Sequence, residues 1–136
     1  MKRIPIYLLV VFAACFLYLP AHAQSVTWNT DQMLSVSTEN TTTPDVAVSG
    51  NRAVAVWAQR DGDFDHIYAS YSTNGGETWS TPQLIEDNFY RAQKPRVFMS
   101  GEKVVAIWEQ FNGSVINVYS NFSTDGGVTW LATASP

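Results

Sequence analysis

The strongest constraint on the fold of this chain is an internal repeat with a period of 51 residues. Aromatic, glycine, proline and hydroxyl positions recur at this offset without a gap: Pro44, Gly50, Trp57, Gly62, Tyr68, Ser72, Gly75, Gly76, Thr78 and Trp79 return as Pro95, Gly101, Trp108, Gly113, Tyr119, Ser123, Gly126, Gly127, Thr129 and Trp130. Thr27-Trp28 lies 51 residues before Thr78-Trp79, so the pattern also extends backwards. Such a period predicts stacked copies of one supersecondary unit.

Each copy predicts four short antiparallel strands. The expected strands are Asp45–Ser49 and Arg96–Ser100, then Ala53–Gln59 and Val104–Gln110, then His66–Ser72 and Val115–Ser123, and a fourth that starts at Glu77 or Val128 and runs past the Trp. Ser49-Gly50 and Asn74-Gly75-Gly76 predict tight turns that need positive φ. No stretch has helical apolar spacing, so we expect an all-β fold. Four-stranded antiparallel units at a period near 50 are typical of β-propeller blades.

The segments Ser72–Trp79 and Ser123–Trp130 resemble the Asp-box, or BNR repeat, whose pattern is Ser-x-Asp-x-Gly-x-Thr-Trp. The resemblance implies four-stranded antiparallel blades of a sialidase-like β-propeller, incomplete in this chain. In that family the box joins the third and fourth strands on the face away from the active site. We therefore expect a structural role for the box residues, which are Ser72, Asn74, Gly76, Thr78, Trp79, Ser123, Asp125, Gly127, Thr129 and Trp130. Asn74 replaces Asp, and Asn still accepts a turn hydrogen bond.

The repeat also predicts the division of the chain. Residues 24–43 are expected to hold an outer strand of a preceding blade (Val26–Val36) and a linker, residues 44–94 the first full blade, and residues 95–136 a truncated second blade. Propellers use about 4–8 blades, so two units predict further blades or self-association. The chain is then either the N-terminal part of a longer protein or a segment that assembles with others.

The first 23 residues have the order of a secretory signal peptide. A positive start is followed by an apolar run to Leu19 and by Ala21-His22-Ala23, which offers small residues before a cleavage site. The expected location is secreted or periplasmic, without membrane attachment after cleavage. An uncleaved anchor and lipidation at Cys15 are the alternatives.

Composition excludes several functions. The single cysteine lies in the leader, which removes disulfides, a cysteine nucleophile and thiolate metal sites from the rest of the chain. The net charge is −4, and removal of Lys2 and Arg3 makes the remainder more acidic, so we expect no nucleic-acid partner.

After its second expected strand, the first unit carries charged residues that the second unit lacks. Arg60, Asp61, Asp63 and Asp65 stand where the next unit has Phe111, Asn112, Ser114 and Ile116. The resemblance implies a sialidase arginine and an acid/base aspartate near this point, so Arg60, Asp63 and Asp65 are the catalytic candidates. However, Asn40–Asp45 lacks the family's first arginine, Gln59 replaces its glutamate, and the other site residues come from later blades. We expect no complete sialidase site.

Two further clusters are candidates for binding. Arg91, Lys94 and Arg96 form a basic group near Tyr90 that suits an anion, although a solvated loop is the simpler interpretation. Asp61, Asp63 and Asp65 alternate, which suits Ca²⁺. The EF-hand template fails because His66 and Ser72 hold its glycine and acid positions, so we expect a polar hairpin and no cofactor, with a weak calcium site as the alternative.

The resulting hypothesis is an exported Asp-box repeat protein that acts as a binding or scaffold module for glycans or surface proteins. The alternative is the N-terminal part of an exo-α-sialidase or related glycosidase. An arginine-bearing inner strand in further units would favour the enzyme.

Overall fold

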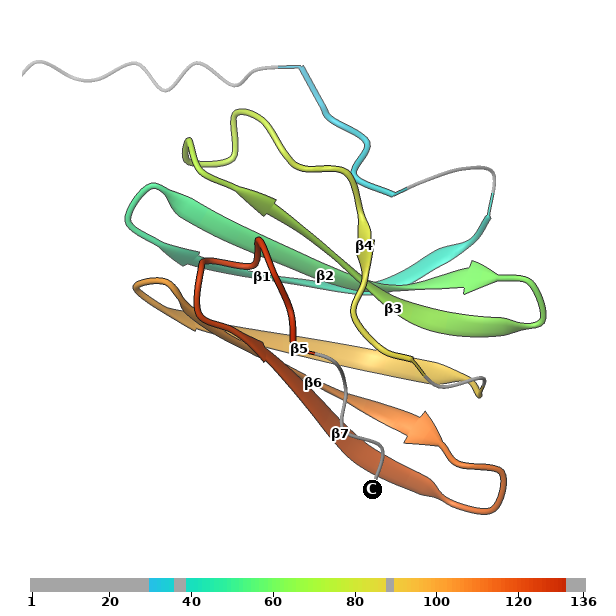
Figure 1. Cartoon of the computed structure of the whole chain (residues 1–136). Helices are drawn as coiled ribbons and strands as arrows, with labels where there is room; N and C mark the ends of the chain where they lie inside the picture. Colours follow the sequence, from blue (N-terminus) through green and yellow to red (C-terminus); the bar gives the residue numbers. More distant parts are fainter. Residues whose placement is uncertain (1–29, 36–38, 88–89, 132–136) are drawn as a thin grey trace, which may run out of the picture.

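The computed structural model of the protein describes residues 30–35, 39–87 and 90–131. Within these ranges the regular structure is entirely β: β1 (Thr41–Ser49), β2 (Arg52–Asp61), β3 (Phe64–Ser72), β4 (Gln83–Leu84), β5 (Ala92–Ser100), β6 (Lys103–Phe111) and β7 (Ile116–Ser123). Two antiparallel sheets result, one in the order β1-β2-β3-β4 and one in the order β5-β6-β7 (Figure 1). The all-β prediction is confirmed. The described residues contain no helix that could cross a membrane.

The first three strands of each unit follow the sequence pattern, and the fourth does not. We expected a strand from Glu77, whereas the observed one is only Gln83–Leu84. The reason is local, because Thr78 lies in the box turn and its N–H is bonded to the Asn74 side chain. The repeat counterpart of β4 falls on residues 134–135, outside the described residues. The strand that we expected to start at Val128 is not formed over the described residues 128–131, so that start is wrong, and a later fourth strand in the second unit stays a prediction.

The expected leading strand is also only partly described. Residues 30–35 form no strand, and the remainder of Val26–Val36 lies outside the described residues, as does the leader at 1–23. The predicted domain boundaries therefore stay predictions at the N-terminal end.

The first strand of each unit carries the same bulge. The register shifts between Thr42 and Asp45 in β1 and between Gln93 and Arg96 in β5. Thr43 and Lys94, which precede Pro44 and Pro95, have positive φ values of 50° and 54°. Proline cannot donate to a sheet ladder, so the pairing of each strand is interrupted at its proline.

The two sheets stack face to face through an apolar core. The face of the first sheet that enters this core, here the forward face, carries Ala47, Val54, Val56, Ala58, Ile67, Ala69 and Tyr71. The face of the second sheet that meets it, here the rear face, carries Val97, Met99, Val104, Ala106, Trp108 and Tyr119. Asp45 joins the two first strands, because its Oδ2 accepts the N–H of Val97 at 3.0 Å.

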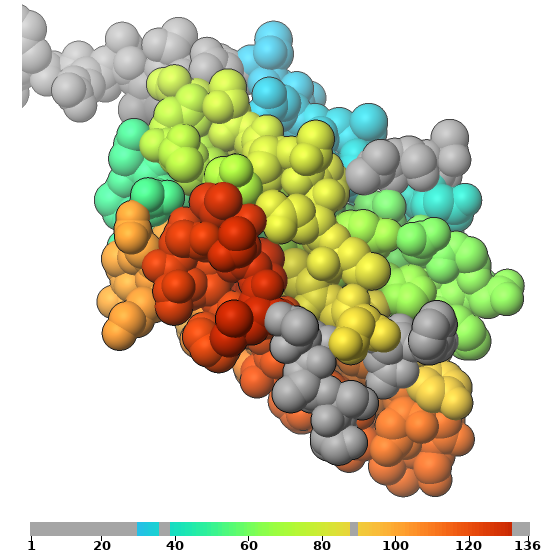
Figure 2. Space-filling view, in the orientation of Figure 1, coloured from blue at the N-terminus to red at the C-terminus, as the bar shows by residue number. Residues whose placement is uncertain are grey.

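The second box packs onto the first sheet. The Gln83 side chain donates to the Val128 carbonyl at 3.3 Å, and a Cβ built at Gly126 would lie 2.8 Å from Arg52 Nη1. Gly127 has φ +90°, and a Cβ built there would lie 2.9 Å from Val54 Cγ2. Glycine is therefore required at this position by both conformation and space. In Figure 2 the red atoms of this box lie against the yellow and yellow-green atoms of the first unit.

Candidate functional site

The two ends of the sheets carry different chemistry. Each box lies beside the turn between the first two strands of its unit, as the 2.7 Å bond from the Gly75 N–H to the Asn51 carbonyl illustrates. The β2–β3 hairpin with Arg60 lies at the opposite end of the first sheet (Figure 1). The boxes and the charged hairpin are therefore separated by the length of the strands.

The first box is a closed network of short hydrogen bonds. Ser72 Oγ donates to Asn74 Oδ1 and accepts the N–H of Gly76, both at 2.9 Å. Asn74 Oδ1 also accepts the N–H of Thr78 at 2.9 Å, while Asn74 Nδ2 donates to Thr78 Oγ1. The indole N–H of Trp79 donates to the Gly76 carbonyl at 3.0 Å. Asn74 thus makes the turn bonds expected of the aspartate that it replaces.

The second box repeats this network with a carboxylate. Asp125 Oδ1 accepts from Ser123 Oγ at 2.6 Å and from the N–H of Thr129 at 2.9 Å, while its Oδ2 accepts from Thr129 Oγ1 at 2.6 Å. These bonds, led by that from Ser123, lower the pKa of Asp125 from 3.8 to about 2. Gly127 donates to Ser123 Oγ at 2.9 Å. The indole nitrogen of Trp130 is buried and makes no hydrogen bond.

At the other end, the β2–β3 hairpin presents the charged residues singled out in the sequence. Arg60 and Asp65 are cross-strand partners, and the Arg60 Nε–H donates to the Gly62 carbonyl at 3.1 Å. Gly62 has φ +68°, which permits the tight turn. The Nε–H of the Arg60 guanidinium is therefore held by a backbone carbonyl of its own hairpin.

The stacking of the sheets brings a second arginine to Arg60. A hollow of about 370 Å³ is lined by Arg60, Asp63 and Phe64 of the β2–β3 hairpin and by Arg91, which directly precedes β5, and Phe111 of β6. Arg91 and Phe111 are held together, since the Phe111 N–H donates to the Arg91 carbonyl at 3.0 Å. We call these five residues the hairpin hollow.

The three aspartates of the hairpin have three different surroundings. Asp61 accepts from the Tyr68 hydroxyl at 2.7 Å, and Asp65 accepts from the Gln93 side chain at 2.9 Å, whereas Asp63 lines the hairpin hollow. Burial, followed by the hydrogen bond to Asp61, raises the pKa of Tyr68 to about 12.

In the described ranges no three carboxylate, histidine or cysteine groups converge as a metal ligand set. The weak calcium site that we kept as an alternative at the alternating aspartates stays a prediction.

The basic cluster of the sequence is divided between two places. Arg91 lines the hairpin hollow, whereas Lys94 and Arg96 line a separate hollow of about 290 Å³ on the second sheet, together with Ile107, Trp108, Glu109 and Val118. Lys94 Nζ lies 2.9 Å from Glu109 Oε2. The bulge at Lys94 interrupts the alternation of β5, so neighbours in sequence do not share a site.

A buried polar chain that sequence reasoning missed links the sheets. His66 Nδ1 pairs with Glu86 Oε1, Glu86 Oε2 accepts from Gln110 Nε2 at 3.0 Å, and Gln110 Oε1 accepts the indole N–H of Trp108 at 2.8 Å. The Glu86 side chain is only 1% exposed. A signal existed, because Trp-x-Gln occurs in both units, and the Trp57 indole donates to Gln59 in the same way at 3.1 Å.

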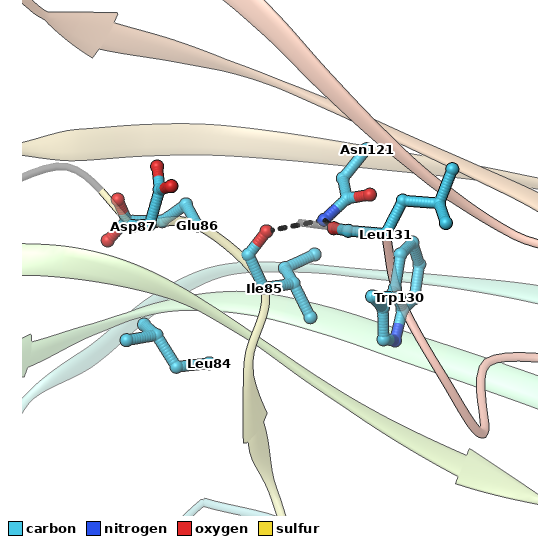
Figure 3. Close-up of a pocket in the computed structure, with 7 residues that line it drawn as sticks. All are labelled: Leu84, Ile85, Glu86, Asp87, Asn121, Trp130 and Leu131. Carbon is cyan, nitrogen blue, oxygen red and sulfur yellow. Dashed lines mark hydrogen bonds between the residues drawn. The ribbon is translucent and has the colours of Figure 1, made fainter. Parts of the chain in front are cut away.

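Beside these hydrogen-bonded side chains, a further hollow of about 210 Å³ lies between the end of β4 and the second box (Figure 3). Asn121 spans it, with Nδ2 donating to the Ile85 carbonyl at 2.9 Å and to the Leu131 carbonyl at 2.7 Å. The Trp130 ring and the Leu131 side chain line one side, and Leu84 and Asp87 lie on the other. The Asn121 amide nitrogen therefore ties β7 to two backbone carbonyls, one on each side of the hollow.

Comparisons with known proteins show a likeness in fold. No protein-family model matches the chain, and no curated protein matches its sequence. Among solved structures, Zg3597, a family 117 glycoside hydrolase produced by the marine bacterium Zobellia galactanivorans, has a similar fold with a TM-score of 0.51 and 12% sequence identity. The match covers 68% of this chain and 37% of that chain. At this identity the likeness is one of fold alone, and it extends over little more than a third of that enzyme.

Proposed function

We propose that this chain is an exported Asp-box repeat protein, built from blades of a sialidase-like propeller, that binds acidic glycans in the hairpin hollow. The observation that carries the proposal is that Arg60, in β2, and Arg91, which directly precedes β5, line one hollow. The two box networks support the family resemblance, because both copies make the hydrogen bonds that the motif requires.

The chemistry of the hairpin hollow suits a sugar that carries a carboxylate or a sulfate. Guanidinium groups bind such anions through paired charge-assisted hydrogen bonds. The rings of Phe64 and Phe111 offer apolar walls, and binding sites for small ligands combine apolar walls with a few polar groups. Asp63 adds one acceptor for sugar hydroxyls. A nucleic acid is disfavoured by the net charge of −4.

Calorimetric titration with 3′-sialyllactose, with lactose as the neutral matched ligand, tests this proposal. Sialyllactose is expected to bind and lactose to bind far more weakly. Arg60→Ala and Arg91→Ala are each expected to weaken binding by about 10–100-fold, the equivalent of one charge-assisted hydrogen bond. Lys94→Ala is the matched control, because Lys94 lies outside the hairpin hollow, and it should bind like the parent. Equal binding of both sugars would contradict the proposal.

A catalytic role is the second candidate, and the broken repeat favours it. Arg60, Asp63 and Asp65 have no counterparts in the second unit, which is the pattern expected where a site departs from its scaffold. Zg3597, a structural neighbour, is a glycoside hydrolase, and the match covers 37% of it. On this reading the chain is the N-terminal part of an exo-α-sialidase or related glycosidase whose remaining site residues come from further blades.

Export rests on the leader. The order of positive start, apolar run and Ala21-His22-Ala23 supports removal after Ala23 and a secreted or periplasmic location. Mass spectrometry of the exported protein should find Gln24 at its N-terminus. A lipid on Cys15 or an intact Met1 would contradict cleavage at this site.

A further inference from the structure

The second sheet has an apolar face that nothing in the described structure covers. Phe98, Val105 and Phe122 form one cross-strand row on this face and are 60%, 42% and 46% exposed. Val118 on the same face is 74% exposed. In Figure 1 no described element lies on the side of the second sheet away from the first. An exposed apolar patch of this kind marks an interaction surface more often than a solvated one.

The 51-residue repeat identifies this exposed face as the counterpart of the forward face of the first sheet. Displaced by 51 residues, the forward face of the first sheet becomes Phe98, Val105, Ile107, Glu109, Val118, Ser120 and Phe122, which is this exposed surface. In the first sheet the forward face is buried against the rear face of the second. The second sheet therefore exposes the same kind of surface that the first sheet buries. Glu109 adds a carboxylate to it, and Lys94 compensates that charge at 2.9 Å.

The matching rear face exists on the first sheet. Displaced backwards by 51 residues, the rear face becomes Val46, Val48, Ala53, Ala55, Trp57 and Tyr68. Val46 and Val48, on β1, are 57% and 63% exposed, whereas Ala53, Ala55 and Trp57 are already buried. The accessible part of this rear face is thus its β1 side.

The contact between the two sheets joins unlike faces of equivalent units. Such a head-to-tail contact is heterologous, and it repeats until a ring closes or a filament grows. We propose that the forward face of the second sheet binds the β1 side of the rear face of the first sheet in a second copy of this chain. The intermolecular contact then repeats the stacking within one chain. It does not involve the hairpin hollow, so it stands independently of glycan binding.

Sedimentation velocity and light scattering of the chain without its leader measure this association. Protein concentrations up to about 100 µM detect a contact whose Kd lies at or below that concentration. The parent is expected to associate with rising concentration. Val118→Lys removes the forward contact and Val48→Lys removes the rear contact, so each variant alone should be monomeric. Both side chains are exposed in the single chain, so circular dichroism should match the parent. The matched control is Val115→Lys, 54% exposed in the β6–β7 loop and on neither face, which should associate like the parent.

Mixing the two variants makes the test specific to unlike faces. The Val118→Lys chain keeps its rear face and the Val48→Lys chain keeps its forward face, so an equimolar mixture should form a species with the mass of two chains and stop there. A parent that stays monomeric throughout would overturn the proposal. So would a Val48→Lys variant that associates like the parent, because that result identifies pairing of two forward faces.

Discussion

Gln110 accepts the indole N–H of Trp108 at 2.8 Å within the packed interface between the two sheets. Both side chains are nearly inaccessible, and Gln110 passes a hydrogen bond on to Glu86 at 3.0 Å. Since a buried donor without a partner is costly, this pair both fixes the Trp108 ring and ties the second sheet to the loop that follows β4. A buried polar chain therefore accompanies the apolar packing between the two sheets.

Gln110→Ala should therefore destabilise the protein by about 2–4 kcal/mol, because it strips the Trp108 indole of its acceptor and leaves a cavity. Urea unfolding followed by tryptophan fluorescence measures the change. Gln93→Ala is the control, since it removes the bond to Asp65 at a half-buried position and should cost about 1 kcal/mol or less. Equal losses in the two variants would contradict a special role for the buried chain.

Gly127→Ala should be more harmful than Gly50→Ala. Both glycines have positive φ, which costs an alanine about 1–2 kcal/mol. At Gly127 the new Cβ also meets Val54 Cγ2 at 2.9 Å, whereas nothing lies within 4 Å at Gly50. We expect an additional loss of about 1–3 kcal/mol from overpacking at Gly127. Thermal unfolding of the two variants compares them directly. Equal melting temperatures would contradict close packing of the second box against Val54 of the first sheet.

Asp125 should contribute an acid-dependent part of the stability. Its pKa is lowered to about 2 in the folded chain, so its contribution is fully present above pH 4 and disappears as the pH falls towards 2. Asp125→Ala should cost about 1–2 kcal/mol at pH 7 through lost turn bonds. Asp125→Asn should cost less, since Asn74 makes the equivalent bonds in the first box. The difference between parent and Asp125→Asn should shrink between pH 4 and pH 2. A difference that stays constant across that interval would refute the carboxylate's role.

This chain alone should not cleave sialosides. Hydrolysis needs a carboxylate clamp, an acid/base and a nucleophile held together, and the hairpin hollow offers Arg60, Arg91 and Asp63 without a nucleophile pair. The assay is release of a fluorophore from a sialic-acid glycoside by the chain without its leader, with an Arg60→Ala, Asp63→Ala double variant as control. Turnover by the parent that vanishes in the double variant would make the enzyme interpretation primary.

Much of each sheet followed from local sequence. Alternation and β-branched runs predicted the first three strands of both units, and Gly50 and Gly75 lie at turns with the expected positive φ. These features depend on neighbours in the chain, so the repeat was sufficient to place them. The short β4 was not predicted, because the hydrogen bonds of the box occupy the backbone where the Glu77 strand would begin.

The candidate site was only half predictable. Charge and position singled out Arg60 and Asp63, but their meeting with Arg91 and Phe111 depends on how the sheets stack. The same dependence separated Lys94 and Arg96 from Arg91, since the bulge in β5 turns them to another surface. Glu86 lies in a connection, where a carboxylate is usually solvated, and only the packing of the second sheet buries it.

Mapping of sialyllactose on the ¹⁵N-labelled chain shows whether the hairpin hollow is the glycan site, because amide chemical shifts report where a ligand binds. We expect the largest changes on the backbone around Arg60, Asp63, Arg91 and Phe111, at the end of the sheets away from the boxes, and we expect them to disappear in Arg91→Ala. Changes centred on the second box at Asp125 and Thr129, or unaltered changes in Arg91→Ala, would contradict glycan binding in the hairpin hollow.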